Sequence, residues 1–344
     1  MSQSSERKDP FLSFKKLICN LLLNVHPICT NKWSHPLTML LIHKYYLNVQ
    51  TVYSEYKLVK YKCKLENINY LFGYAAKCGN IIIVKWCLKN KVDVHTDVYG
   101  ESFAFRDDSD YALRYAAENG HLEIVRLLLK YGANVHAQKG GIICMAAKNN
   151  HLEVVKLLLE AKADVHAIDD LALRYAAENG HLEMVKLLLT IKANIHVKND
   201  EALCESIKNN HIEISKLLIN SSTDGHIWNN QVLVEAAKIG HLEIVQLLIA
   251  TGIDIHANNN SALRYAAHNG HLEMVKFFLN RGADIHAING ALSVASINGH
   301  VEVTKFLIDK GANISVINKY AIQNSILHDN VEIIKFLKEK GVLS

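Results

Sequence analysis

Histidine is the residue whose number and spacing in this sequence could support chemistry. The chain has 19 histidines, and a neutral imidazole is a common zinc ligand. Most of them fall into two columns that recur along the chain at a nearly constant spacing. One column follows a glycine or an asparagine and contains His121, His151, His181, His211, His241, His271 and His300. The other contains His95, His136, His166, His196, His226, His256 and His286.

The spacing within these columns argues against a shared metal ion. Elements that pack side by side in successive copies lie roughly 8–10 Å apart, whereas zinc holds its nitrogen ligands at about 2.0–2.1 Å. We also expect no cysteine or carboxylate column that could complete a site. The sequence therefore predicts no metal site, and we interpret the histidines as hydrogen-bonding residues that join turns.

Known catalytic motifs are missing from the sequence. It contains no GxxxxGK[ST] phosphate loop, no HExxH and no GxSxG, and no cysteine lies in a plausible context with histidine and asparagine. We predict no catalytic residues, no cofactor and no enzymatic activity.

The first histidine column belongs to a repeat of 30 residues, with one step of 29. The clearest copy, ALRYAAENGHLEIVRLLLKYGANVHA, runs from Ala112 to Ala137 and returns from Ala172 and from Ala262. Its small Ala116-Ala117 pair lets another backbone approach closely, and the segment from Leu122 to Leu129 is apolar over too wide an arc for one partner. Each copy is therefore predicted to be a pair of helices stacked between neighbours.

The residue before the anchor histidine predicts the turn between the two helices. It is Gly, Asn or Asp in every copy, and these types tolerate a positive φ, so we expect a left-handed residue that ends the first helix. A glutamate such as Glu123 follows in the first turn of the second helix, where the helix dipole favours a carboxylate. A Lys or Arg three residues later, such as Arg126, is expected to pair with it at the surface.

These residues resemble the ankyrin repeat. GHLEIVRLLLKYGANVHA is similar to the family pattern TPLHxAAxxGHxxVVxLLLxxGAxxxA, and the resemblance implies an all-α ankyrin-repeat solenoid of about nine helix-turn-helix repeats. The Thr-Pro-Leu-His opening has become xALR here. The link between repeats is three residues shorter than the 33-residue family period requires, so shortened inter-repeat hairpins are expected. Short-period arrays of this composition are similar to the ankyrin proteins of giant amoeba-infecting DNA viruses.

Two parts of the chain are predicted. Residues 1–63 contain all three prolines and do not show the repeat, and we interpret them as an N-terminal helical cap or as a small adaptor module. Residues 64–344 form the array. Its repeats lie near 66–95, 110–136, 140–166, 170–196, 200–226, 230–256, 260–286, 289–315 and 319–344. An insertion of 11 residues, within roughly 96–110, separates the first two repeats.

The overall composition of the chain indicates where the protein is located and which class of partner it binds. The net charge is +4, from 38 basic and 34 acidic residues, which is too balanced to indicate nucleic acid. Seven scattered cysteines without a Cys-x-x-Cys pair indicate a reduced compartment. No signal peptide and no membrane span is evident. We expect a monomer in the cytoplasm or nucleus, with an infected host cell as one possible setting.

Recognition of one or more proteins is the function that this reasoning leaves. By the resemblance, the two residues after each alanine pair face the concave groove, and the inter-repeat turns form its rim. These positions vary between copies, so stacking does not constrain them. The predicted partner-binding residues are Glu118, Asn119, Lys148, Asn149, Glu178, Asn179, Lys208, Asn209, Lys238, His268 and Asn269, with Trp228 in a turn and Tyr99, Phe103 and Phe105 in the insertion.

Alternatives stay open at three points. The favoured function is a non-enzymatic scaffold, but a substrate adaptor for a ubiquitin ligase that uses residues 1–63 competes with it. Nucleic-acid binding through the repeated Arg-Tyr pairs, which begin at Arg114, Arg174 and Arg264, is a weaker alternative. The aromatic residues of the insertion, like Trp228, could either bind a partner or fill a gap between repeats.

Overall fold

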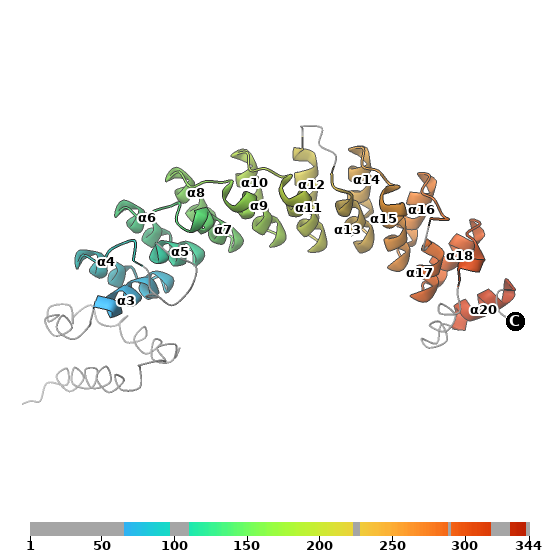
Figure 1. Ribbon diagram of the computed structural model, residues 1–344, viewed down its shortest axis with the longest axis horizontal. Helices are drawn as coiled ribbons and strands as arrows, with labels where there is room; N and C mark the ends of the chain where they lie inside the picture. The colour runs from blue at the N-terminus through green and yellow to red at the C-terminus, as the bar shows by residue number, and fades with distance from the viewer. Residues whose placement is uncertain (1–64, 97–109, 223–227, 288–289, 318–330, 342–344) are drawn as a thin grey trace, which may run out of the picture. The chain divides into compact units, whose positions relative to one another are not determined.

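The computed structural model describes residues 65–96, 110–222, 228–287, 290–317 and 331–341. The chain divides into two units, residues 1–64 and residues 65–344, so every described residue belongs to the second unit. These residues form seventeen α-helices and no strand (Figure 1), which confirms the all-α fold class. The predicted cap or adaptor, and the insertion with Tyr99, Phe103 and Phe105, lie outside the described residues.

The helices come in pairs, one pair to a repeat. The first helices are α3 (Leu65–Lys77), α5 (Tyr111–Glu118), α7 (Gly141–Lys148), α9 (Ala167–Glu178), α11 (Val197–Lys208), α13 (Asn230–Ile239), α15 (Ala257–His268) and α17 (Ala291–Ile297). The second helices are α4 (Ile81–Lys89), α6 (Leu122–Lys130), α8 (Leu152–Glu160), α10 (Leu182–Thr190), α12 (Ile212–Ser221), α14 (Leu242–Ala250), α16 (Leu272–Asn280), α18 (Val301–Asp309) and α20 (Val331–Glu339). Short 3₁₀ turns, η3 (Gln138–Gly140) and η4 (Ile314–Val316), complete the described elements.

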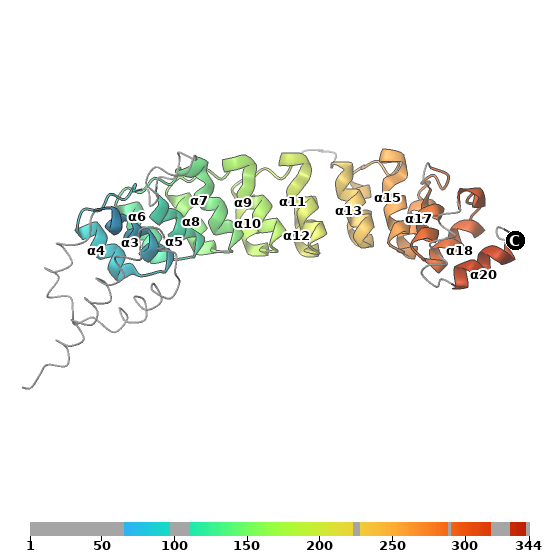
Figure 2. The ribbon, with the colours of Figure 1, turned by 60° about the horizontal axis from the view of Figure 1, so that its bottom comes forward.

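Stacking between repeats buries the positions that the periodicity predicts. First helices lie in one row and second helices in another (Figures 1 and 2), and each first helix from α3 to α15 contacts the first helix of the next repeat. The Ala116-Ala117 pair is fully buried, because only small side chains allow two helix backbones to lie so close. On the second helix Ile124, Val125 and Leu128 are buried as well. The core is thus continuous from repeat to repeat, as a solenoid requires.

The turn within each repeat contains the predicted left-handed residue. Positive φ values between 61° and 90° are found at Gly79, Gly120, Asn150, Gly180, Asn210, Gly240, Gly270 and Gly299. The second helices from α6 onward then open with the predicted glutamate. The predicted surface pair follows in six of them: Glu123 with Arg126, Glu153 with Lys156, Glu183 with Lys186, Glu213 with Lys216, Glu273 with Lys276 and Glu302 with Lys305.

The link between repeats is a tight turn whose residues have left-handed backbone conformations. Residues 168–170, at the start of α9, have φ values from 51° to 56°, so the right-handed helix begins only at Leu171. Residues 198–200 and 258–260 repeat this left-handed turn. Three consecutive left-handed residues form each of these turns, and no strand occurs in the ranges given above. The predicted shortening of the hairpins is therefore confirmed.

Within those ranges, no helix is both long enough and apolar enough to cross a lipid bilayer.

Candidate functional site

The first histidine column joins successive repeats by hydrogen bonds. In each pair the imidazole Nε2 lies 2.8–3.1 Å from a backbone carbonyl oxygen at the end of the preceding first helix. A carbonyl only accepts, so Nε2 donates. These carbonyls belong to the last helical turn and lack intrahelical partners. The pairs are His121 with Lys77, His151 with Glu118, His181 with Lys148, His211 with Glu178, His271 with Lys238, and His300 with His268. The prediction that histidines join turns is confirmed.

His241 interrupts this ladder. Its Nε2 is buried and has no hydrogen-bond partner among the described residues. Burial lowers the pKa of the His241 imidazole, and the nearby His271 lowers it further. The interruption falls between repeats five and six.

The second histidine column is accompanied by a column of buried acidic and amide side chains that the sequence analysis missed. His166 Nδ1 lies 2.9 Å from Asp170 Oδ1, and the same oxygen accepts a bond from the backbone N–H of Asn194, in the following inter-repeat turn, at 2.8 Å. The arrangement recurs at Asp110 and Asn260, and at Asp200 the histidine and the backbone N–H bind different carboxylate oxygens. Three of these four buried residues are aspartates.

This geometry gives the polar columns a structural use. Each buried carboxylate or amide holds one histidine and one backbone N–H of the following turn, which satisfies groups that would otherwise be buried without partners. No cluster of three or more candidate metal ligands occurs among the described residues. Burial raises the pKa of the Cys87, Cys144 and Cys204 thiols to about 12, so these thiols do not ionise near neutral pH and are poor nucleophiles.

The predicted partner-binding residues of the groove lie at the C-terminal ends of the first helices. Four of the asparagine side chains there make hydrogen bonds within the array. Each Nδ2 donates to a carbonyl one turn earlier on its own helix, at 2.8–2.9 Å. These are Asn119, Asn179, Asn209 and Asn269. Asn149 instead donates across the repeat boundary to the Glu118 carbonyl, at 2.7 Å. The asparagines therefore cap helices as well as lining the face.

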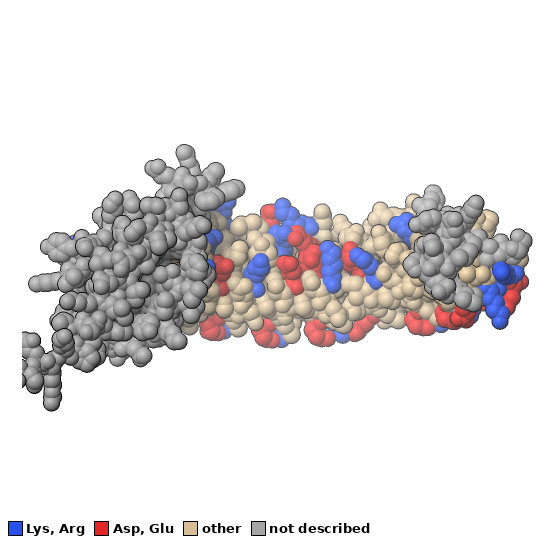
Figure 3. Space-filling model, turned by 90° about the horizontal axis from the view of Figure 1, so that it is seen from below, with Lys and Arg blue, Asp and Glu red and all other residues tan. Residues whose placement is uncertain are grey.

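The charged residues of this face make different contacts in different repeats. Lys148 Nζ lies 4.9 Å from the centre of the Tyr175 ring in the next repeat. Lys208 Nζ lies 2.7 Å from Glu205, and this hydrogen bond raises the pKa of the lysine. Figure 3 shows basic and acidic side chains interspersed over the visible part of this face. Its electrostatic character thus changes from repeat to repeat.

Trp228 is 1% exposed, whereas Lys198 and Asn258, which hold the same position in the flanking repeats, are exposed. Its ring centre lies 4.8 Å from that of His196 in the preceding repeat. This burial favours the gap-filling interpretation of Trp228 over the partner-binding one.

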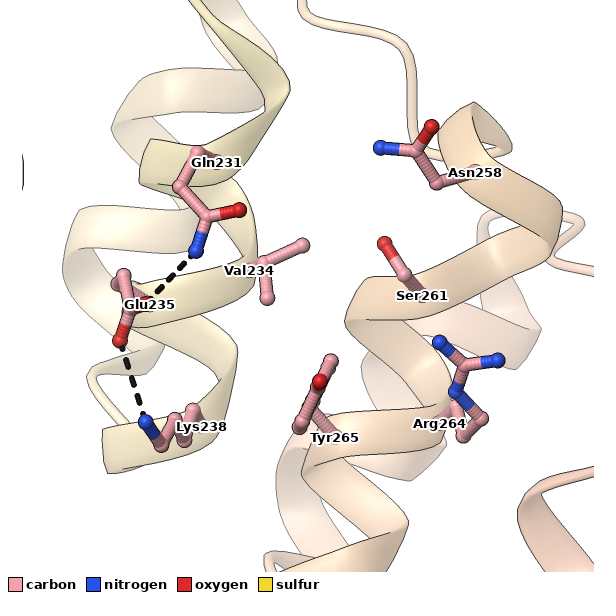
Figure 4. Close-up of a pocket in the computed structure, with 8 residues that line it drawn as sticks. All are labelled: Gln231, Val234, Glu235, Lys238, Asn258, Ser261, Arg264 and Tyr265. Atoms are coloured by element: carbon pink, nitrogen blue, oxygen red, sulfur yellow. Dashed lines mark hydrogen bonds and ion pairs between the residues drawn. The ribbon is translucent and has the colours of Figure 1, made fainter.

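A pocket of about 210 Å³ lies between α13 and α15 (Figure 4). Its α13 wall carries Glu235, which accepts a 2.7 Å hydrogen bond from Gln231 and lies 3.6 Å from Lys238 Nζ. Its α15 wall carries Arg264 and Tyr265. Lys238 is a predicted partner-binding residue, but the sequence analysis did not find the pocket, because it forms only where two first helices meet.

The array divides its residues into two sets. Constant residues build the stack, and varying residues cover one face of it, which is the architecture of a recognition module. Models of ankyrin repeats in three copies match residues 17–139, 143–231 and 203–289, and a model of ankyrin repeats in many copies matches residues 292–337. The chain therefore belongs to the ankyrin-repeat family.

Ankyrin repeats are generally protein–protein interaction modules, and proteins built from them are typically non-enzymatic. The first match begins at residue 17, inside the part predicted to be a cap or an adaptor. No curated protein matches the chain.

Proposed function

We propose that this chain is a non-enzymatic scaffold that binds one or more proteins on the face formed by the C-terminal ends of the first helices and the inter-repeat turns. The observation that carries the proposal is the division of polar residues between two uses. Histidines, asparagines and buried aspartates hold the stack together. Charged side chains such as Lys148, Glu178 and Lys238 are exposed, lie outside the buried core and differ in sign between repeats.

The surroundings of the Arg-Tyr pairs support a protein partner over nucleic acid. Arg174 is paired with Glu201 of the next repeat, at 2.6 Å. The Arg114 guanidinium lies 5.0 Å and 4.8 Å from the Tyr111 and Tyr115 ring centres. Nucleic-acid binding needs clustered, accessible basic residues. Arg174 and Arg114 instead contact other side chains of the array, and acidic residues lie among the basic residues of the face.

For residues 1–63 we propose a cap made of further, degenerate repeats rather than a ligase adaptor. The ankyrin match that starts at residue 17 supports this proposal. We also propose that the protein acts as a monomer inside the cell, where its scattered cysteines stay reduced. The similarity to arrays of giant DNA viruses rests on repeat period and composition alone and stays a prediction.

Affinity purification of the full chain with two matched double variants tests the scaffold. Lys148→Glu with Glu178→Lys reverses two charges on the first-helix face, and Glu183→Lys with Lys186→Glu reverses two on the second helix α10. Both variants keep the net charge. We expect the first to lose the specific partners and the second to retain them. Partners that survive both changes, or that are lost only with the α10 variant, would contradict the proposal.

The same purification tests the cap. Deleting residues 1–63 should leave the set of partners unchanged apart from any loss of stability in the first repeat. Ubiquitin-ligase subunits that copurify with the full chain and disappear on this deletion would establish the adaptor instead.

A further inference from the structure

We infer that the pocket between α13 and α15 receives an acidic side chain, Asp or Glu, of a protein partner, with Arg264 as its main cation. This inference rests on the proposed function, because it names the chemistry of one contact made by that partner. The pocket, at about 210 Å³, is smaller than the 300–1,000 Å³ typical of small-molecule sites. It therefore suits one inserted side chain.

Comparison of Arg264 with its two counterparts provides the first argument. Arg174 has Glu201 of the next repeat as its carboxylate partner, but the residue equivalent to Glu201 next to Arg264 is Gly290. Arg114 also lacks that glutamate, but its guanidinium lies near two tyrosine rings. Arg264 lies near one ring, 5.6 Å from the centre of Tyr265, and lines the pocket. Arg174 thus receives a carboxylate from the next repeat, whereas Arg264 receives none at the equivalent position.

The local charge provides the second argument. In repeat four the inter-repeat turn carries Asp169 and Asp170, whereas the turn that leads into α15 carries Asn259 and Asn260. Repeat seven has thus replaced two carboxylates by neutral amides while keeping its arginine. Of the pocket's three charged residues, two are cations, and the one anion, Glu235, is already held by Gln231 and Lys238. An incoming anion meets a net positive site.

The open space above Tyr265 provides the third argument. In repeat four, Lys148 of the preceding helix lies over the Tyr175 ring and fills the equivalent space. At α13 the equivalent lysine, Lys238, lies toward Glu235 instead (Figure 4), and Tyr265 is left 36% exposed. A side chain of a partner can therefore enter between the two helices.

A basic side chain is the competing occupant, because Glu235 is 6% exposed and lies at the pocket wall. Its Oε1 accepts from Gln231, whereas its buried Oε2 has no hydrogen bond and lies 3.6 Å from Lys238 Nζ, so an entering cation would have to approach that oxygen beside Lys238. Lys238 and Arg264 would repel the entering cation, most strongly where water is excluded. The arrangement selects for an anion, and a carboxylate can take a bidentate bond from guanidinium.

A phage-displayed library of short random peptides is the probe, selected in parallel on the full wild-type chain, on Arg264→Gln and on Arg114→Gln as the matched control. We expect wild type and Arg114→Gln to select peptides with an Asp or Glu at a fixed position, and Arg264→Gln to lose that enrichment. A synthetic peptide from the wild-type selection should bind about tenfold or more weakly when its acid is changed to the amide, since a hydrogen bond to a charged group is at stake. On Arg264→Gln the acid and amide peptides should bind equally.

The outcomes separate this inference from the proposed function. Peptides that bind the wild type without an acidic position, or whose acid preference survives Arg264→Gln, would overturn the inference and leave the scaffold intact. A fixed basic position would assign the pocket to the competing occupant. Failure of the first-helix charge reversals to affect partner binding would overturn the scaffold itself. If Arg264→Gln does not fold, Arg264→Lys replaces it, and its expected effect is a smaller loss of the acid preference, because lysine cannot donate in a bidentate manner.

Discussion

Ile168 shows how a single residue can carry the strain of the short repeat. It has a φ of 55° and is 44% exposed. A left-handed conformation costs a β-branched residue roughly 1–2 kcal/mol, whereas asparagine tolerates it. Asn258 holds the same position in repeat seven, with a φ of 50°.

Exchanging these two residues is therefore expected to have opposite effects. Ile168→Asn should stabilise repeat four by about 1 kcal/mol, and Asn258→Ile should destabilise repeat seven by a similar amount. Hydrogen exchange measured separately for each repeat gives the change in stability for both variants. Loss of protection in repeat four on Ile168→Asn would mean that the Ile168 side chain stabilises the turn more than its backbone strain weakens it.

Trp228 provides a second test at the residue scale. Because it is buried against His196, Trp228→Ala should cost about 3–5 kcal/mol, the range for deletion of a buried aromatic ring. Binding of partner, measured on the same sample at a temperature where the variant stays folded, should be unchanged. Unchanged stability with weakened binding would restore the partner-binding interpretation.

His241 predicts a local pH dependence. Its folded-state pKa lies below the ordinary value of 6.5, so the unfolded chain binds more protons in the window just below that value. Stability of repeats five and six should therefore fall as the pH is lowered from about 8 to about 5.5. His241→Gln should flatten this pH profile, as followed by hydrogen exchange in those repeats. A profile that is as steep in His241→Gln as in the wild type would assign the dependence to other groups.

At the scale of the element, the turn inside each repeat is shaped by two constraints rather than one. The predicted left-handed residue is present at Gly120, and a Cβ added there would lie 2.4 Å from Nδ1 of His151 in the next repeat. The glycine thus leaves room for the ring whose Nε2 bonds the Glu118 carbonyl. Gly132, between two repeats, has a φ of 90° and nothing within 4 Å of such a Cβ.

Substitutions at these two glycines distinguish destabilisation by backbone strain from destabilisation by contact with the His151 ring. Gly132→Val should cost about 1–2 kcal/mol, from strain alone. Gly120→Val should cost about 1–3 kcal/mol more, because the His151 ring must move. Gly120→Asn should be milder, since Asn150 occupies this position in the next repeat and His181 still bonds to the Lys148 carbonyl at 2.8 Å. Thermal unfolding of the three variants checks the order. Equal losses for Gly120→Val and Gly132→Val would remove the ring contact from the explanation.

At the scale of the whole array, stability is expected to be distributed among neighbouring repeats. Leu128 and Leu188 are fully buried on second helices, and substituting either by alanine should cost about 2–5 kcal/mol. Contacts link neighbours, so repeats beside the change should open before distant ones. Hydrogen exchange should show repeat eight largely protected in Leu128→Ala. A uniform loss of protection across all repeats would indicate a fully cooperative array.

The sequence by itself determined the repeat, the helix pairs, the left-handed residue between them and the surface ion pairs. All of these follow from positions within one copy. Periodic apolar residues fix which side of a helix is buried, and the φ preference of Gly and Asn fixes the turn, so neither needs knowledge of the neighbouring copy. The predicted binding residues at the ends of the first helices share one face for the same reason.

Only the tertiary structure decided which polar groups the stack itself uses. His151 reaches a carbonyl 33 positions earlier, and Asp170 reaches a backbone N–H 24 positions later. Such partners meet only when the helices and turns of successive repeats lie on one another. The pocket at Arg264 arises in the same way, because it forms where the first helices α13 and α15 of neighbouring repeats meet. A sequence read one copy at a time does not contain these pairings, whereas stacking sets them by bringing equivalent positions of adjacent repeats together.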